Sequence, residues 1–231
     1  MVKIGSGSYD LNTWLYGGYE SEIVTVLYGG PGTGKTNLCI LAATSQAKKG
    51  NKVIYIDSEG GFSTDRVKQI INGSAEELDS VLKNILLLKP TNFKEQKQAF
   101  ESLEKHLKDH VSLIIVDSIT ILYRLDFADA REKGDEEIQK INSELVRQIK
   151  TLAEIARKKE IPVLVTNQVY NWDDERKMVG GDILRYWAKC LIEMTYDKGR
   201  REIHLVKHRS LKEKTMTFVI DDKGIKKRGW I

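Results

Sequence analysis

One short segment constrains the fold of this chain more than any other, the run GGPGTGKT at Gly29–Thr36. It matches the pattern G-x-x-x-x-G-K-[ST] at every fixed position, follows a β-branched apolar run at Ile23–Tyr28 and precedes a helical stretch at Asn37–Lys49. Glycines let the backbone N–H groups of such a loop turn inward around phosphate oxygens, and the helix that follows points its positive end at the anion. A phosphate site between a strand and a helix is therefore predicted.

Individual residues of this motif have separate chemical tasks. The Lys35 amine is expected to reach the β- and γ-phosphates of a nucleoside triphosphate, and the Thr36 hydroxyl is expected to ligate Mg²⁺. We therefore predict ATP and Mg²⁺ as the ligands of this site. The predicted nucleotide contacts from this segment are Gly29, Gly30, Pro31, Gly32, Thr33, Gly34, Lys35, Thr36 and Asn37.

Strand-like and helix-like segments alternate along the following part of the chain. Four further apolar runs are predicted strands: Val53–Ile56, Ile85–Leu88, Leu113–Val116 and Val163–Val165. Two longer segments are predicted helices, one rich in Lys, Glu and Gln and one with apolar residues at three- and four-residue steps: Phe93–Asp109 and Ile138–Ile155. Continuous apolar strands joined by helices predict an α/β fold with a mostly parallel twisted sheet flanked by helices.

The last third of the sequence has a different pattern. Three segments there alternate apolar and polar residues, with short turns between them: Leu191–Thr195, Glu202–His208 and Thr215–Ile220. This pattern predicts antiparallel strands added to the sheet edge. Residues 223–231 are predicted to form a basic C-terminal tail, whose candidate DNA contacts are Lys226, Lys227 and Arg228. The alternative for this tail is a terminus whose charges only maintain solubility.

Composition excludes several classes of protein. The chain has 231 residues, of which 41% are hydrophobic, and no linker divides it, so one domain over residues 1–231 is expected. Lys and Arg number 37 and Asp and Glu 33, and a net charge of +4 is too small for the whole surface to bind polyanions. Cys39 and Cys190 lie far apart in apolar surroundings, which predicts buried free thiols. No window approaches the ~18 apolar residues of a membrane span, so a cytoplasmic protein is expected.

Acidic and amide residues follow three of the predicted strands. Asp117 ends the run LIIVD and is the expected holder of Mg²⁺ through water, beside Thr36. Glu59 follows the second strand, where it is either a general base for an attacking water or a solvated loop carboxylate. Gln168 either senses the γ-phosphate or takes part in helix capping or a turn. Because ligands of parallel sheets bind at the carboxyl edge of the strands, these side chains are candidates for one site.

The ordered set of motifs resembles the RecA/RadA recombinase ATPase family. The phosphate loop is followed by YIDSEGGF, LIIVDS, VTNQV and GGDIL, and the resemblance covers about Tyr9 to Lys226. Within this family the chain is similar to the RadB group, the short archaeal paralogues of RadA. Only about twenty residues precede the first core strand, which leaves no room for the helix-hairpin-helix DNA-binding domain that RadA has there.

This resemblance implies an accessory role in recombinational DNA repair, with ATP binding, weak Mg²⁺-dependent ATPase activity, DNA binding and no strand exchange by the protein alone. Carried over by position, Glu59 matches the catalytic glutamate, Gln168 the glutamine that senses the γ-phosphate, and Arg66 the arginine that stacks on adenine. The implied partners are single-stranded or branched DNA, the recombinase RadA, and a nuclease for branched DNA such as a Holliday-junction resolvase. A homo-oligomer is compatible with this resemblance.

Two segments match the DNA-binding loops of RadA-like proteins and differ from them in length or charge. The second loop corresponds to Tyr170–Val179, which is short and in which acidic residues offset basic ones. Tyr170 and Trp172 could stack on bases there or pack within the loop. The first loop corresponds to Tyr123–Glu136, where the candidate DNA contacts Arg124 and Arg131 lie among aspartates.

Two further patterns concern contacts between subunits. The run FADA, Phe127–Ala130, formally matches the FxxA signature by which RadA subunits polymerise, but it lies inside the first loop, so we interpret it as coincidence and expect no long filament. Lys207 and Arg209 are two residues apart and would share a face of a strand. They resemble the K-x-R finger that KaiC- and RecA-type assemblies present to a neighbouring ATP site, and solvated edge-strand charges are the alternative.

Three functions are compatible with these patterns. The first is an ATP-dependent recombination mediator, in which ATP orders the DNA-binding loops. The second is a regulatory module that binds partner proteins and uses ATP as a structural ligand. The third is a KaiC-like signalling ATPase, which Lys207 and Arg209 would suit. A small-molecule kinase would need a lid and an acceptor pocket, for which the sequence shows no segment.

Overall fold

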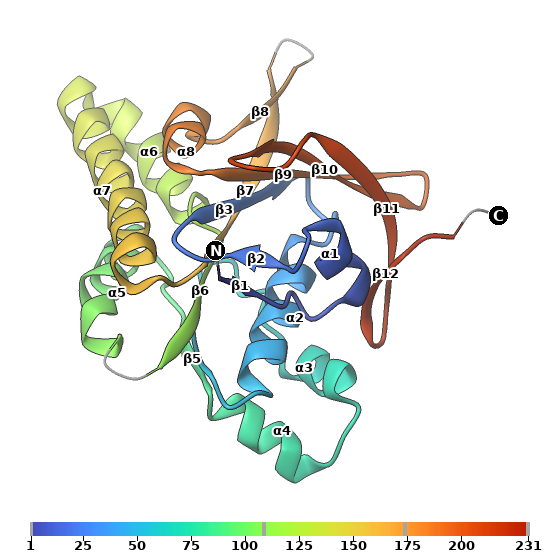
Figure 1. Ribbon diagram of the computed structural model, residues 1–231. Coiled ribbons are helices and arrows are strands. Elements are labelled where there is room, and N and C mark those ends of the chain that lie inside the picture. Colours follow the sequence, from blue (N-terminus) through green and yellow to red (C-terminus); the bar gives the residue numbers. More distant parts are fainter. Residues whose placement is uncertain (1, 108–109, 173–174, 230–231) are drawn as a thin grey trace.

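The computed structural model describes residues 2–107, 110–172 and 175–229, without the side chains of residues 171–176. Within these residues a ten-stranded sheet has the strand order β12-β11-β10-β9-β3-β7-β6-β4-β5, with β8 paired to β7 (Figure 1). A separate two-stranded sheet joins β1 (Lys3–Ile4) to β2 (Tyr19–Glu20). The predicted α/β class with a mostly parallel central sheet is confirmed.

The parallel part of the sheet contains every apolar run that was predicted to be a strand. Its members are β3 (Val24–Gly29), β4 (Lys52–Asp57), β5 (Ile85–Leu88), β6 (Val111–Asp117), β7 (Val163–Trp172) and β9 (Cys190–Asp197). In β6, Ile114 and Val116 face one helical layer and Leu113 and Ile115 face the other, and all four are fully buried. Burial on both faces is the reason for the continuous apolar runs.

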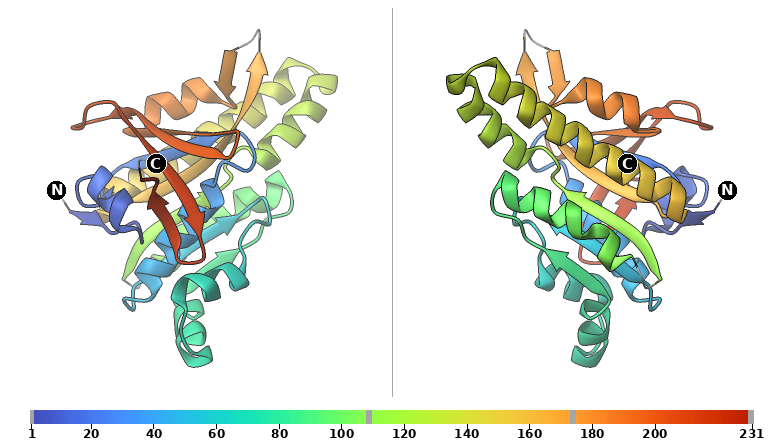
Figure 2. Two further views of the ribbon diagram at one scale, coloured as in Figure 1. Left: turned by 90° about the vertical axis from the view of Figure 1, so that its right-hand side faces the viewer. Right: turned by 90° about the vertical axis from the view of Figure 1, so that its left-hand side faces the viewer.

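Helices cover both faces of this sheet (Figures 1 and 2). One layer consists of α1 (Tyr9–Trp14), α2 (Lys35–Ala47), α3 (Thr64–Ile71) and α4 (Ala75–Leu82). The other consists of α5 (Phe93–His106), α6 (Ile121–Lys133), α7 (Asp135–Lys159) and α8 (Gly181–Trp187). None of the helices in the described part of the chain is long and apolar enough to cross a membrane.

The long helix α7 illustrates how local sequence sets an element's limits. Its first turn contains three acidic residues, Asp135–Glu137, and its last turn three basic ones, Arg157–Lys159, which complement the helix dipole at both ends. The chain leaves the helix at Glu160, which has a left-handed conformation, and Pro162 follows. The predicted apolar face, Ile138–Ile155, lies within this helix, and its central residues pack on the sheet.

Of the three segments expected to be antiparallel edge strands, two lie in β10 (Arg200–His208) and β11 (Lys214–Asp221), whereas the third, Leu191–Thr195, lies in β9. The strands β10 and β11 join the sheet through β9, which is parallel to β3 on one side and antiparallel to β10 on the other. Within the segment predicted to be a basic tail, Gly224–Lys227 form a further strand, β12, that pairs with β11. The Ser8 hydroxyl and the Asp10 carboxylate in the N-terminal region bond to the backbone of β12, which holds it in place.

The segment matched to a first DNA-binding loop, Tyr123–Glu136, is not a loop. It lies mostly in the helix α6. Tyr123 and Ala130 are buried where this helix packs on its neighbours on the same side of the sheet. The Phe127 ring is partly buried and packs on the Tyr123 ring with centroids 5.5 Å apart, against this chain's own core. The FADA run is therefore a helical packing element here. The Arg124 and Arg131 side chains are exposed.

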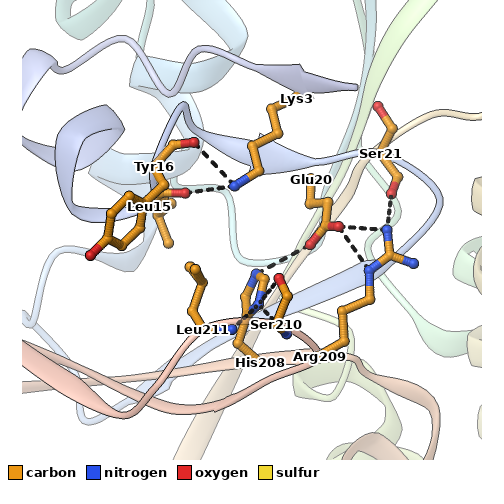
Figure 3. A network of polar contacts seen from close by, with 9 residues as sticks. All are labelled: Lys3, Leu15, Tyr16, Glu20, Ser21, His208, Arg209, Ser210 and Leu211. Carbon is orange, nitrogen blue, oxygen red and sulfur yellow. Dashed lines mark hydrogen bonds and ion pairs between the residues drawn. The ribbon is translucent and has the colours of Figure 1, made fainter. Parts of the chain in front are cut away.

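A buried ionic network joins the N-terminal two-stranded sheet to the end of β10 (Figure 3). The Glu20 carboxylate, 1% exposed, lies 2.6 Å from Arg209 Nη2 and 3.3 Å from His208 Nε2. His208 Nδ1 accepts hydrogen bonds from the backbone N–H groups of Ser210 and Leu211. Because Nδ1 is an acceptor, the neutral ring has its proton on Nε2, which faces Glu20.

This network corrects the expectation that Lys207 and Arg209 share one face of a strand. β10 ends at His208 and its register shifts between Leu205 and Lys207, so Arg209 lies beyond the strand. The Lys207 amine donates to the carbonyl oxygens of Arg185 and Ala188 near the end of α8. Arg209 instead contacts Glu20, so the two cations point to different partners within the chain.

The buried His208 predicts a loss of stability in mild acid. Burial lowers the pKa of His208 from its ordinary value of 6.5, helped by nearby cations and opposed by Glu20. The stabilisation is therefore complete above about pH 6.5 and is lost as the pH falls through the lowered pKa, by at most about 1.4 kcal/mol per pH unit. In urea unfolding between about pH 7 and pH 5, the wild type should lose more stability than His208→Asn, whose oxygen can accept the same backbone hydrogen bonds.

The matched control for this prediction is His204→Asn, because His204 has a 36% exposed side chain on the same strand. This variant should keep the pH dependence of the wild type. Equal pH slopes for the wild type and His208→Asn would contradict the prediction.

Candidate functional site

The phosphate loop occupies the turn between β3 and α2, at the carboxyl edge of the parallel strands. Gly29 lies so close to β9 that a Cβ there would come within 2.1 Å of the Met194 carbonyl oxygen, so this position requires glycine. Gly32 and Gly34 have φ angles of 72° and 108°, which glycine adopts at no steric cost. At Gly30 and Gly32, no atom of the described residues lies within 4 Å of where a Cβ would stand, so this part of the loop faces open space.

The Lys35 amine lies at the centre of this loop. Its Nζ donates to the carbonyl oxygens of Gly29 and Gly30 at 2.9 and 2.8 Å and to Gln168 Oε1 at 3.4 Å. Burial lowers the pKa of the amine, while nearby carboxylates, first among them that of Glu59, act in the opposite direction. A phosphate oxygen would be a stronger acceptor for this amine than the neutral carbonyls, since charge-assisted hydrogen bonds are the stronger kind.

Lys35, Glu59 and Gln168, which are the predicted catalytic residues, come into contact from three separate parts of the chain. Gln168 Nε2 donates to Glu59 Oε1 at 2.9 Å, and the amide oxygen of the same Gln168 accepts from Lys35. In the parallel register of β3 and β7, Gln168 stands directly opposite Gly29. The amide therefore links the candidate base to the lysine that is predicted to bind phosphate.

Asp57 shapes the loop that presents Glu59. Its two carboxylate oxygens accept hydrogen bonds from the backbone N–H groups of Gly61 and Phe62, both at 3.0 Å. The Glu59 N–H donates to the Asp117 carbonyl oxygen at 3.3 Å, which ties the loop to the next strand. Sequence reasoning missed this role of Asp57, although a carboxylate before a Gly-Gly pair is a recognisable turn signal.

Asp117 is the most deeply buried acid of the site, with no exposed surface. Oδ2 accepts from the Tyr55 hydroxyl at 2.9 Å and Oδ1 from the Thr166 hydroxyl at 2.5 Å. Burial raises the pKa of Asp117, and hydrogen bonds from Thr166, Thr36 and Tyr55 lower it. Tyr55 and Thr166 were not predicted as site residues, because both read as ordinary strand residues.

The oxygen donors at this place suit Mg²⁺. Within the described residues, no group of three or more His, Cys, Asp or Glu side chains could hold a metal ion by itself. A hydroxyl at Thr36 and a carboxylate at Asp117, which share a hydrogen bond, are the kind of oxygen ligands that Mg²⁺ takes together with nucleotide phosphates. The residues present therefore fit the predicted ion.

A pocket of about 400 Å³ opens in front of the phosphate loop. Its lining residues are Pro31, Gly32, Gly34, Lys35, Thr36, Asn37, Glu59, Gln168, Arg201 and Ile220. All but two of them were predicted from sequence. Arg201 and Ile220 come from the antiparallel strands β10 and β11, and the sequence pattern alone does not show which end of those strands approaches the loop.

Comparison with known proteins agrees with this geometry. The family model described as Rad51 matches residues 1–228. The chain belongs to the Rad51 family. Members of this family are nucleotide-binding ATPases that generally depend on Mg²⁺, and they act on DNA in recombination.

The relatives of this Rad51-family chain include several proteins of one name, "DNA repair and recombination protein RadB". The protein from Methanococcus maripaludis strain C7 is 39% identical over 216 residues, covering 93% of this chain and 96% of its own. That from Methanobrevibacter smithii is 38% identical over 226 residues, covering 93% and 92%. That from Methanocaldococcus jannaschii is 37% identical over 211 residues, covering 91% and 96%. The predicted similarity to the archaeal RadB group is confirmed.

Arg66, matched by position to an adenine-stacking arginine, lies on α3 next to the pocket. Its Nη2 donates to the Asp221 carbonyl oxygen at 2.8 Å and to that of Gly224 at 3.4 Å. These bonds hold the turn between β11 and β12, directly after the pocket residue Ile220. Its stacking on adenine stays a prediction.

The candidate DNA contacts of this Rad51-family chain do not form one cluster. Tyr170 is 39% exposed on the β7–β8 hairpin, while the side chain of Trp172 lies outside the described residues. Lys226 forms an ion pair with Asp221 at 2.6 Å, and the Lys227 side chain is exposed on the same strand. Arg228 is exposed just beyond it. DNA contact by any of these residues stays a prediction.

A buried contact connects the site to both predicted DNA segments. Asn167 precedes Gln168, has no exposed surface, and accepts a hydrogen bond from the Thr120 hydroxyl at the start of α6. Its Nδ2 donates at 2.8 Å to the carbonyl oxygen of Val179, which follows β8 (Glu175–Met178). The hairpin and α6 are therefore both attached to the residue next to the amide that contacts Lys35 and Glu59.

The hydrogen bond from Thr166 predicts the pH dependence of Mg²⁺ binding. In Thr166→Val, Asp117 loses a donor that lowers its pKa, so the carboxyl protonates at a higher pH and binds Mg²⁺ more weakly. We expect Mg²⁺-dependent nucleotide affinity to fall about tenfold near pH 6 and by less near pH 8. Calorimetric titration at the two pH values measures both.

The control is Thr44→Val, because Thr44 is a buried threonine of α2 whose hydroxyl has no hydrogen-bond partner among the described residues. It should bind Mg²⁺ and nucleotide like the wild type. A Thr166→Val variant with the same loss at both pH values would show that protonation of Asp117 is not involved.

Proposed function

We propose that this chain is an ATP- and DNA-binding accessory protein of homologous recombination and DNA repair, with weak Mg²⁺-dependent ATPase activity and no strand exchange by itself. The contact of Lys35, Gln168 and Glu59 in a Rad51-family fold carries this proposal. A phosphate-binding lysine, an amide and a candidate base in one cluster are the parts that ATP hydrolysis needs. The names of the RadB relatives support the role in repair, and the cytoplasm is the proposed location.

In the proposed reaction, each residue has one task. Lys35 binds the β- and γ-phosphates, Thr36 ligates Mg²⁺, and Asp117 holds it through water. The bound ion supplies positive charge that offsets the charge of the phosphates. Glu59 accepts a proton from the attacking water, and the hydrogen bond from Gln168 keeps its carboxylate oriented toward the pocket.

The same contacts support an ATP-dependent switch of the DNA-binding segments. Lys35 and Glu59 both contact Gln168, so a γ-phosphate that draws Lys35 away would change the bonds of this amide. Its neighbour Asn167 is attached to α6 and to the end of the β7–β8 hairpin. The hairpin and the turn between α6 and α7 both lie toward the upper end of the molecule in Figures 1 and 2, so this end can present both segments to DNA.

The proposed partners are single-stranded or branched DNA, the recombinase RadA and a Holliday-junction resolvase. The DNA contacts proposed on α6, the hairpin and the last strand are Arg124, Arg131, Tyr170, Trp172, Lys226, Lys227 and Arg228. A homo-oligomer is compatible with this proposal.

A partner-binding module with ATP as a structural ligand is the second candidate. Pairing of Lys226 with Asp221 favours it, because a cation neutralised within the chain has less charge to offer to DNA phosphates. The KaiC-like alternative depends on Lys207 and Arg209, and the contacts of both within this chain do not support a finger role.

The variant Glu59→Gln tests hydrolysis and switching together. It keeps the oxygen that accepts from Gln168 and removes the proton acceptor, so ATP binding should persist while turnover falls about 100-fold or more. Affinity for single-stranded DNA, measured by fluorescence anisotropy over a salt series, should be higher with ATP than with ADP or without nucleotide. In Glu59→Gln the tight state should persist for longer after ATP addition.

Two further variants serve as controls for this experiment. Glu104→Gln changes an exposed carboxylate of α5 and should behave like the wild type. Lys35→Ala should lose ATP binding and any effect of ATP on DNA affinity. DNA affinity that is the same in all nucleotide states would favour the partner-binding module.

A further inference from the structure

Arg201 occupies a position where the pattern of β10 places apolar core residues. Alternate residues of a strand point to the same face, and Ile203 and Leu205, which continue the row of Arg201, are both fully buried in the cluster that α2 covers. Arg201 stands opposite Tyr196 on β9 and Phe218 on β11. This row therefore ends in a cation at the place where the core meets the phosphate loop.

The contacts of Arg201 leave most of its donors unused. Its guanidinium covers the Tyr196 ring, with Cζ 4.3 Å from the ring centroid, and Nη2 is 3.5 Å from the Gly32 carbonyl oxygen. Nε is buried and has no hydrogen-bond partner in the described part of the chain. Among the same residues, no carboxylate forms an ion pair with Arg201. A guanidinium is always charged and binds phosphate in a bidentate manner, so unused donors beside a phosphate loop indicate an anion.

The neighbouring arginine provides a contrast. Arg200 is exposed and lies on the opposite face of β10, where it contacts Glu202 at 3.5 Å and the Thr217 hydroxyl at 3.1 Å. Of these two arginines, only Arg201 lines the pocket that contains Lys35. Two cations at adjacent positions thus have different surroundings, one with partners on the surface and one at the nucleotide pocket.

We infer that Arg201 binds the phosphate chain of the nucleotide that sits in the same subunit. This inference rests on the proposed function, because it requires ATP in the pocket. The phosphates then lie between Lys35 and the phosphate loop on one side and the Arg201 guanidinium on the other, with the Tyr196 ring supporting the guanidinium. Each subunit supplies its own second cation, so tight ATP binding does not need a neighbouring subunit.

Affinities for Mg²⁺–ATP, Mg²⁺–ADP and AMP, measured by calorimetry on the full chain, test this role. Arg201→Ala should bind ATP about tenfold more weakly and AMP nearly as well as the wild type, because AMP lacks the phosphates that the guanidinium contacts. Arg201→Gln keeps a donor for the Gly32 carbonyl but no charge, and should bind ATP as weakly as Arg201→Ala. Arg201→Lys should recover part of the affinity, and Arg200→Ala should match the wild type.

Mixing separates contact within a subunit from contact between subunits. Equimolar Lys35→Ala and Arg201→Ala chains should show no ATP affinity beyond that of the two variants alone, whereas tight sites formed on mixing would overturn the inference. It also falls if Arg201→Gln binds ATP like the wild type, since the side chain then only supports the phosphate loop. If the wild type binds ATP and Lys35→Ala does not, either of these two results rejects the inference about Arg201 and leaves the proposed function in place. If the wild type does not bind ATP, the proposed function fails as well.

Discussion

The hydrogen-bonded register of the parallel strands is the constraint on which the rest of this structure depends. Gly29 at the end of β3 stands opposite Gln168 on β7, and Asp57 on β4 stands opposite Asp117 on β6. This alignment brings the phosphate loop, the amide and two carboxylates to one edge of the sheet. A shift of one residue in any of these pairs would turn every side chain of that strand to the other face, which would place core residues at the site.

The site is also built directly on the core, and Asp117 shows the consequence. A carboxylate without exposed surface is costly unless other groups stabilise its charge. Tyr55, Thr166 and Thr36 donate hydrogen bonds to it, and a bound Mg²⁺ would add a full opposite charge. Affinity for metal and nucleotide is therefore coupled to the packing of the central strands.

The antiparallel strands attach two different functions to the two ends of β10. At one end, His208 and the adjoining Arg209 contact the buried Glu20 and connect the large sheet to the N-terminal two-stranded sheet (Figure 3). At the other end, Arg201 lines the pocket in front of the phosphate loop. Arg209 lies at the end away from this chain's own phosphate loop, and the cation that reaches the loop comes from a position that the finger pattern did not indicate.

The sequence by itself determined the phosphate loop, the mostly parallel character of the sheet and the candidates Glu59, Asp117 and Gln168, because motif spacing and apolar runs are local patterns. Tertiary structure alone decided that Tyr123 and Phe127 pack within a helix and that the basic tail begins as a strand, since both depend on burial against distant elements. It also decided where the Arg201 side chain lies, beside the phosphate loop. The sequence of a strand does not show whether a charged residue in it faces solvent or a site. The pairing of the strand with its neighbours decides what lies beside that residue.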